Sequence, residues 1–397
     1  MLRKSLALKI FDAFSLQRWN DQLRPCDFTE MDKHAHKMIS AYVIGRFNED
    51  KGVNVNWIKI INGGIFELFR RIALTDIKAP IRIHIKRNKP HLYKKLNEWI
   101  FEQFDPLIDE SEFKDDFKNY LLKDNYLDET SNKILKSAHI YTSYWEFKKI
   151  KTIDPLGYGI KQIDSTFGEI LDVYKDVYGL KEIMSGEIPA GFIDLCGQLR
   201  FQIRWGHIPR IPKTSVLGHM LCVAIYAYLF TLSTNSCTGR KYNNFFGGLF
   251  HDLPEAVTRD IISPVKKSVQ GLDRYLKEVE TIFVEKEIFS LIDPKWKQEL
   301  QYYIENEFEN KIIDQGIVNT IASYEEMDRK YNSDYFKPID GFTIKCADDL
   351  SAYIEAYKTN RMGVTSEPIA ECLYKVKNKY KAEKRFALGS LYNDFEL

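Results

Sequence analysis

The feature of this sequence that most constrains its fold is an internal duplication. Residues 63–82 (GGIFELFRRIALTDIKAPIR) align without a gap with residues 247–266 (GGLFHDLPEAVTRDIISPVK). Glycine, phenylalanine, aspartate and proline stand at the same places in both stretches. Self-similarity of this kind indicates that one structural unit occurs twice in the chain.

Further similarities flank the duplicated stretch in the same order. His34 follows Trp19 by fifteen positions, and His219 follows Trp205 by fourteen. Downstream, residues 136–139 (KSAH) correspond to residues 345–348 (KCAD). We therefore predict two domains, 1–185 and 186–397, which meet in the turn-rich stretch SGEIPAG at residues 185–191.

Apolar residues recur in both halves at intervals close to 3.6, which is typical of helices with one buried face. The one stretch of convincing alternation, residues 81–86, could form a short strand. We expect an all-α fold, with helices over residues 2–14, 37–46, 94–102, 112–121, 166–178, 217–232, 272–290, 295–306 and 347–357.

The second copy carries a concentration of polar residues that is typical of metal sites. His251 and Asp252 are adjacent, and Glu255 and Asp260 follow. Residues four apart share one face of a helix, so we expect Glu255 to lie on the same side as His251. The alternative is an ordinary solvated helix start, with Asp252 as its N-cap and Pro254 in its first turn.

Two further candidate ligands lie in apolar stretches. His219 stands in residues 215–227, and Asp348 stands in residues 345–356. Burying such groups is costly unless they are paired or bound to a metal. His219, His251, Asp252 and Asp348 therefore form a candidate ligand set for a divalent ion, with Mn, Co, Fe, Zn, Ni and Mg left open.

The order His…His-Asp…Asp resembles the signature of the HD superfamily of metal-dependent phosphohydrolases. Within it, residues 195–380 resemble the 5'-deoxynucleotidase (YfbR-like) branch, through Arg204-Trp205, His219, the HDLPE run at 251–255 and the KCAD run. One departure is Gly218, because the family usually has glutamate before its first histidine. The resemblance implies two tandem HD-domain helical bundles.

The resemblance also implies roles for individual residues. Glu255 is the expected general base or orienter of the attacking water, and Asp260 is a second catalytic carboxylate. For substrate binding, we expect Arg204 to grip the phosphate, Trp205 to cover the sugar or base, and Lys266 to add positive charge. Taken alone, Arg204 and Trp205 would be interpreted as a surface arginine beside a core tryptophan.

The first copy keeps the order of the aligned stretches but lacks most of the candidate metal ligands. Glu67 and Leu68 stand opposite His251 and Asp252, Arg71 opposite Glu255, and His139 opposite Asp348. We therefore expect a degenerate copy. The resemblance implies that this copy packs against the second as a pseudo-dimer, because relatives of this branch associate as dimers, with a further homo-oligomer left open. A residual three-ligand site of His34, Glu67 and His139 is the alternative.

The composition of the chain limits which kinds of binding partner we expect. The net charge is +1, with 57 basic and 56 acidic residues, which gives no overall case for binding nucleic acid. No apolar run is as long as a membrane span, so we expect no membrane partner. The six cysteines show no paired spacing, and the expected location is the cytoplasm.

The resemblance implies an enzyme that hydrolyses (deoxy)nucleoside 5'-monophosphates to nucleoside and phosphate. One alternative keeps the metal site but changes the substrate to a nucleoside triphosphate or a cyclic or dinucleotide. A second alternative is a non-catalytic nucleotide sensor or scaffold, motivated by the persistence of Arg18, Trp19 and Asp76 in the first copy.

Overall fold

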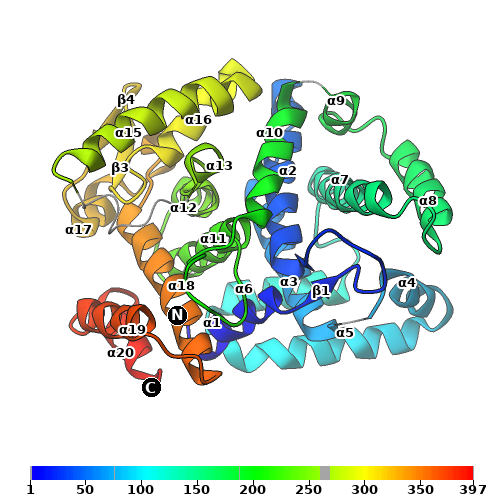
Figure 1. Ribbon diagram of the computed structural model, residues 1–397, viewed down its shortest axis with the longest axis horizontal. Helices are drawn as coiled ribbons and strands as arrows, with labels where there is room; N and C mark the ends of the chain where they lie inside the picture. The colour runs from blue at the N-terminus through cyan, green and yellow to red at the C-terminus, as the bar shows by residue number, and fades with distance from the viewer. Residues whose placement is uncertain (1, 76, 187, 260–268, 397) are drawn as a thin grey trace.

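The chain folds into helices arranged around two central ones. The computed structural model describes residues 2–75, 77–186, 188–259 and 269–396. The helices of the first half are α1 (Lys4–Phe11), α2 (Glu30–Asp50), α3 (Trp57–Leu74), α4 (Ala79–Asn88), α5 (Pro90–Phe104), α6 (Ser111–Leu122), α7 (Glu129–Ile153), α8 (Ile160–Val173) and α9 (Leu180–Ser185) (Figure 1).

The second half repeats this helical character. Its helices are α10 (Ile188–Gln198), α11 (Val216–Leu232), α12 (Thr238–Phe250), α13 (Glu255–Thr258), α15 (Leu272–Phe283), α16 (Pro294–Ile304), α17 (Tyr324–Glu326), α18 (Gly341–Arg361), α19 (Glu367–Tyr380) and α20 (Leu388–Asn393). The prediction of an all-α fold is confirmed.

Sheet structure in the described part of the chain is small. The strands β1 (Gln17–Arg18) and β2 (Phe28–Thr29) pair antiparallel just before α2. A single bridge between Ile203 and Ser215 occupies the corresponding place before α11. The hairpin of β3 (Lys311–Asp314) and β4 (Ile317–Thr320) lies in the second half.

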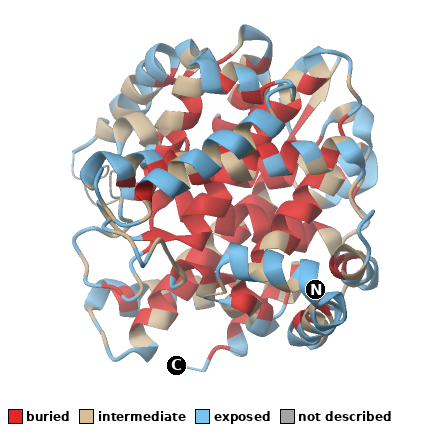
Figure 2. Cartoon of the chain, turned by 90° about the vertical axis from the view of Figure 1, so that its right-hand side faces the viewer, coloured by how far each residue is buried: buried red, intermediate tan, exposed pale blue. Residues whose placement is uncertain are grey.

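The two central helices, α2 and α11, pack against each other and against equivalent neighbours. Helix α2 contacts α3 and α7, and α11 contacts α12 and α18. Every residue of α11 from Val216 to Thr231 is buried, as its apolar sequence requires. Figure 2 shows this buried interior surrounded by exposed residues. The core of the protein is therefore shared between the two halves.

Polar contacts and aromatic rings also join the halves. The Tyr42 hydroxyl donates to Glu299 at 2.6 Å, and the Tyr228 hydroxyl donates to Asn62 at 2.7 Å. The ring of Trp57 lies edge-on to Phe246 with centroids 5.5 Å apart. These contacts are buried or half-buried, so the two halves share an extensive interface and are not independent domains joined by a linker.

The predicted short strand at residues 81–86 is wrong, because this stretch lies within α4. Pro80 stands in the first turn of that helix, where proline is well tolerated. Ile81 and Ile83 are 54% and 46% exposed, so the alternating isoleucines do not form the buried face that a half-buried strand would have. Six residues of alternation are too few to distinguish a strand from an exposed helix.

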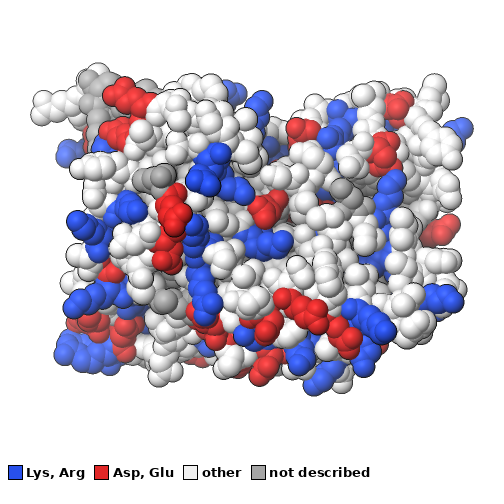
Figure 3. All heavy atoms as spheres, turned by 90° about the horizontal axis from the view of Figure 1, so that it is seen from below, with Lys and Arg blue, Asp and Glu red and all other residues white. Residues whose placement is uncertain are grey.

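No helix in the described residues is both long and apolar enough to cross a membrane. On the face shown in Figure 3, basic and acidic side chains are interspersed, as expected for a chain with nearly balanced charge.

Candidate metal centre

His219 lies near the start of α11 with its ring fully buried. The helix begins after Ser215, whose hydroxyl accepts a hydrogen bond from the backbone N–H of Gly218 at 2.9 Å. This cap fixes the first turn of the helix. The Nδ1 atom of the His219 ring lies 3.0 Å from the hydroxyl of Ser351 on α18. With Nδ1 engaged in this way, Nε2 is left for the interior of the site.

His251 and Asp252 follow directly after α12. The helix expected to carry both His251 and Glu255 is interrupted, because α12 ends at Phe250 and α13 begins at Glu255. Both residues nevertheless line the same cavity, as expected. Pro254 explains the break, since it has no N–H to donate to the Phe250 carbonyl. Leu253 donates to that carbonyl instead, at 2.9 Å, and tightens the turn.

A close approach of two helices brings the turn to α11. A Cβ added to Gly248 would lie 2.9 Å from the Cα of Ala224, so any larger residue would push α12 and α11 apart. The carbonyl of Gly248 also lies 2.8 Å from His251 Nδ1. Both histidines are thus oriented through Nδ1 and present Nε2, an arrangement that metal-binding histidines use.

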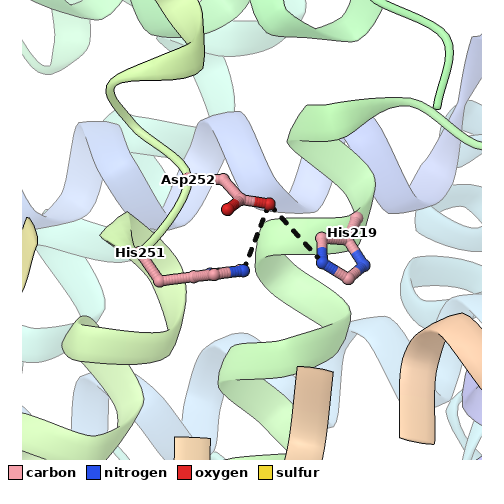
Figure 4. Close-up of side chains that lie close together, drawn as sticks. All are labelled: His219, His251 and Asp252. Carbon is pink, nitrogen blue, oxygen red and sulfur yellow. Dashed lines mark ion pairs between the residues drawn. The ribbon is translucent and has the colours of Figure 1, made fainter. Parts of the chain in front are cut away.

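The side chains of His219, His251 and Asp252 point toward one another (Figure 4). An oxygen of Asp252 lies 3.2 Å from His251 Nε2 and 3.6 Å from His219 Nε2. One ligand atom from each residue falls within a group no more than 4.8 Å across. Three residues predicted as ligands therefore converge. His219 comes from α11, and His251 and Asp252 come from the turn that follows α12.

Asp348, the fourth predicted ligand, extends this group from α18. One of its carboxylate oxygens lies 3.1 Å from His219 Nε2. The other accepts a hydrogen bond from Lys345 at 2.8 Å. Lys345 thus holds the carboxylate in place while one oxygen stays close to His219.

The charges within the cluster follow from this packing. Burial acts to lower the pKa of His251, but the adjacent Asp252 carboxylate raises it to about 9. Burial and nearby Arg204 lower the pKa of His219, so this ring is neutral. His251 and Arg204 hold the pKa of Asp252 far below its usual range, against the effect of burial.

The donor set fits a divalent metal ion. Both Nε2 atoms are buried and make no well-aligned hydrogen bond, although carboxylate oxygens stand about 3 Å away. An unsatisfied buried polar atom is costly, and coordination to an ion would satisfy both. Two imidazoles with carboxylates suit a borderline or hard ion.

Arg204 and Trp205 lie beside the cluster, where they are anchored by Glu355. This carboxylate is 1% exposed and accepts a hydrogen bond from Trp205 Nε1 at 2.8 Å. The Arg204 guanidinium lies 3.3 Å from Glu355 and 3.5 Å from Asp252. Arg204 therefore reaches the edge of the candidate site, and one end of the Trp205 ring is fixed.

Glu255 lines a cavity that opens from the cluster. The cavity is lined by His251, Asp252, Glu255, Thr258, Arg259 and Lys277, among others. The predicted catalytic residue Asp260 and the predicted phosphate-binding residue Lys266 lie outside the described residues. Asp76, which aligns with Asp260, also lies outside the described residues.

Three neighbours of the site were not predicted from sequence. Glu355 stands seven residues after Asp348 in the apolar stretch of α18, and a carboxylate there could have been recognised as a buried partner. Arg210 pairs with Glu355 at 3.6 Å, across a loop without regular pattern. Lys277 reaches the cavity from α15, and no local signal distinguishes it from other surface lysines.

The first half contains a matching anchor. Glu146 on α7 is fully buried and accepts hydrogen bonds from Arg18 Nε and Trp19 Nε1, each at 2.9 Å. Trp19 and Trp205 have φ angles of 53° and 55°, a conformation that bulky residues rarely adopt. The Arg-Trp pair thus has the same local geometry in both halves.

Comparisons with known proteins agree with the geometry. Residues 196–377 match the model of the HD domain family. A 5'-deoxynucleotidase from Shewanella oneidensis is 24% identical over 165 residues, which cover 41% of this chain and 70% of that enzyme. No solved structure is significantly similar to the chain.

Proposed function

We propose that the HD domain in residues 196–377 is a metal-dependent phosphohydrolase that acts on (deoxy)nucleoside 5'-monophosphates. The observation that carries the proposal is the pair of buried Nε2 atoms, on His219 and His251, with a carboxylate oxygen of Asp252 between them. A divalent ion bound between them would satisfy both nitrogen atoms.

His219, His251, Asp252 and Asp348 are the proposed ligands. A divalent ion held there would supply Lewis-acid polarisation of the phosphoryl group. The ligands carry two negative charges, so the loaded site would be near neutral and would tolerate a phosphate dianion. Arg204 is placed to bind a phosphate oxygen, because its guanidinium lies at the edge of the cluster.

Glu255 is the proposed general base or orienter of the attacking water. It lines the same cavity as His251 and Asp252, which supports this role. Asp260 is proposed as the second catalytic carboxylate and Lys266 as an additional phosphate contact. Trp205 is proposed to border the sugar, with its indole N–H held by Glu355.

The 5'-monophosphate class rests on the similarity to the 5'-deoxynucleotidase. We further propose that residues 1–185 are a degenerate HD copy that packs on residues 186–397 as the second half of a pseudo-dimer. The matching anchors at Glu146 and Glu355 and the shared pairing of central helices support this proposal.

Phosphate release from a panel of nucleoside mono- and triphosphates, with Mn or Co added, tests the function. Release from monophosphates by the wild type, and loss in the His251→Ala/Asp252→Ala variant, is the expected result. A Glu67→Gln variant is the matched control, because it changes the aligned position in the first half. Release by the double variant would contradict the assignment.

Other substrates are distinguished by extending the panel to cyclic nucleotides and dinucleotides, with the nucleotide products separated by chromatography, because hydrolysis of a phosphodiester releases no inorganic phosphate. Activity confined to triphosphates, or to cyclic or dinucleotide phosphodiesters, would keep the metal site and replace the substrate. Absence of activity with metal bound would favour the non-catalytic sensor or scaffold.

A further inference from the structure

The first half buries a cluster of charged residues where the second half has its metal ligands. Lys33 and Lys37 of α2 are 1% and 0% exposed. The Lys33 Nζ lies 2.6 Å from His139 Nδ1, and Lys37 donates to Glu67. His139 Nδ1 also lies 2.9 Å from Glu67. Two ammonium groups therefore occupy the space between these potential metal ligands.

Two arginines complete the cluster. Arg18 and Arg71 both contact the same oxygen of Glu30, at 3.1 and 2.6 Å. The second oxygen of Glu30 is buried without a hydrogen-bond partner. Arg71 retains 26% exposure of its side chain and Arg18 retains 14%, so both connect the buried cluster to solvent.

His34 lies unsatisfied within this cluster. Its ring is 1% exposed, and neither ring nitrogen has a hydrogen-bond partner. Its Nε2 is 3.7 Å from the unpartnered oxygen of Glu30. Burial and the adjacent lysines lower the pKa of His34 well below its usual value, so the ring is neutral and can donate one hydrogen bond.

The charge in the cluster is unbalanced. Lys33, Lys37, Arg18 and Arg71 face the carboxylates Glu30 and Glu67, while a third carboxylate, Glu146, is shared by Arg18 with Arg200. Burial lowers the pKa of Lys33 to about 7, which reflects the cost of the buried cation. A bound anion would reduce this imbalance.

The aligned positions in the second half show the opposite pattern. Gly218 stands where the first half has Lys33, and Glu255 stands where it has Arg71. Asp252 and Asp348 are replaced by Leu68 and His139, neither of which is negatively charged. Glu67 stands where the second half has His251, so the exchange removes three carboxylates, adds one, and adds the two cations Lys33 and Arg71. The net change is toward positive charge, which favours an anion over a cation as the ligand.

We propose that the cluster of Arg18, Lys33, His34 and Arg71 binds a phosphate group without a metal ion. Guanidinium and ammonium groups are the usual phosphate donors in proteins. His139, whose side chain is 42% exposed, lies at the solvent side of the cluster. The phosphate could belong to a nucleotide or be free inorganic phosphate. This site is distinct from the proposed catalytic one and does not depend on its activity.

Isothermal titration of the full-length His251→Ala/Asp252→Ala variant in the presence of EDTA tests the proposal. Inorganic phosphate and 2'-deoxyadenosine 5'-monophosphate are titrated separately. We expect saturable binding of one anion per chain. Equal affinities would identify the phosphate group alone as the ligand, whereas at least about tenfold tighter nucleotide binding would identify a nucleotide site.

Adding Arg71→Gln to that variant should weaken binding by about tenfold or more, as expected for loss of a charged contact. Lys33→Met should do the same, and should that buried change prevent folding, partly exposed Arg71 still decides the question. Lys86→Met is the control, because Lys86 pairs with Asp124 at the exposed surface. Absence of binding up to millimolar phosphate, or binding unchanged by Arg71→Gln, would overturn the proposal.

Discussion

The Phe14 ring lies so close to Gly218 that a Cβ at residue 218 would be 2.5 Å from its Cε1 atom. Asp32 and Ser215 crowd the same point, each with an oxygen 3.1 Å from that Cβ. Gly218 precedes His219, and Phe14 and Asp32 belong to the first half. The space that a glutamate would need beside His219 is therefore filled by the other half of the chain.

Substitution of Gly218 by alanine should destabilise the protein. Alanine favours a helix by up to about 1 kcal/mol over glycine, but overpacking against Phe14 costs typically about 1–3 kcal/mol. We expect a net loss of unfolding free energy in urea denaturation. Gly168→Ala in α8 is the control, because its added Cβ would have no atom within 4 Å apart from its chain neighbours and the backbone of its own helix. Equal stabilisation by both changes would contradict the close packing.

Glu355→Gln should reduce both stability and activity. Loss of the buried charge leaves Arg204 and Arg210 without their carboxylate, at a cost on the order of 3 kcal/mol. Because Arg204 lies at the edge of the site, we expect kcat/KM for monophosphates to fall at least about tenfold. Chemical denaturation and phosphate release measure the two effects.

Glu146→Gln is the matched variant in the first half. It removes the same kind of anchor from Arg18 and Trp19, so stability should fall by a similar amount. Its kcat/KM, measured below the unfolding temperature, should stay near that of the wild type. A comparable loss of activity in both variants would show that the first half contributes directly to catalysis.

Metal binding should release about one proton at pH 7 to 8. The pKa of His251 in the metal-free protein is raised to about 9, so the ring is protonated there and must lose its proton to bind a metal. Asp252 and His219 are already deprotonated and neutral, respectively, because their pKa values are lowered. Titrations of Mn into the metal-free protein in buffers of different ionisation enthalpy measure this number.

The same raised pKa has a consequence for the metal-free protein. The stabilisation from protonated His251 is fully present below its unfolded pKa, about 6.5, and is lost as the pH rises through about 9. Metal affinity should change in the opposite direction and increase with pH over this range. An enthalpy independent of buffer would contradict the protonated state of His251.

Much of the fold could be predicted from sequence, since periodicity identified the central helix α11 and several of its neighbours. The convergence of His219, His251, Asp252 and Asp348 could also be expected, because His219 and Asp348 are polar residues in apolar helices and His251-Asp252 form a compact motif. The break at Pro254 could have been recognised as well, from the missing N–H. The position of Glu255 after this break could not be predicted, because the turn depends on packing between α12 and α11.

Other parts of the site depend on tertiary contacts that sequence does not encode locally. The conflict between Phe14 and Gly218 joins residues about 200 positions apart. The ion pairs of Lys33 and Lys37 depend on Glu67 and His139 from two other helices. Sequence alone predicted a degenerate copy there. It did not predict that the ammonium groups of Lys33 and Lys37 lie beside His139 and Glu67.

The content of divalent metal per chain tests the central claim most directly. Metal-free protein is loaded with Mn, freed of excess ion, and analysed by mass spectrometry, for the wild type, His251→Ala/Asp252→Ala and His34→Ala/Glu67→Gln. The account predicts one ion in the wild type and in the first-half variant, and none in the second-half variant. Retention of the ion by His251→Ala/Asp252→Ala, or its loss from His34→Ala/Glu67→Gln, would contradict the account.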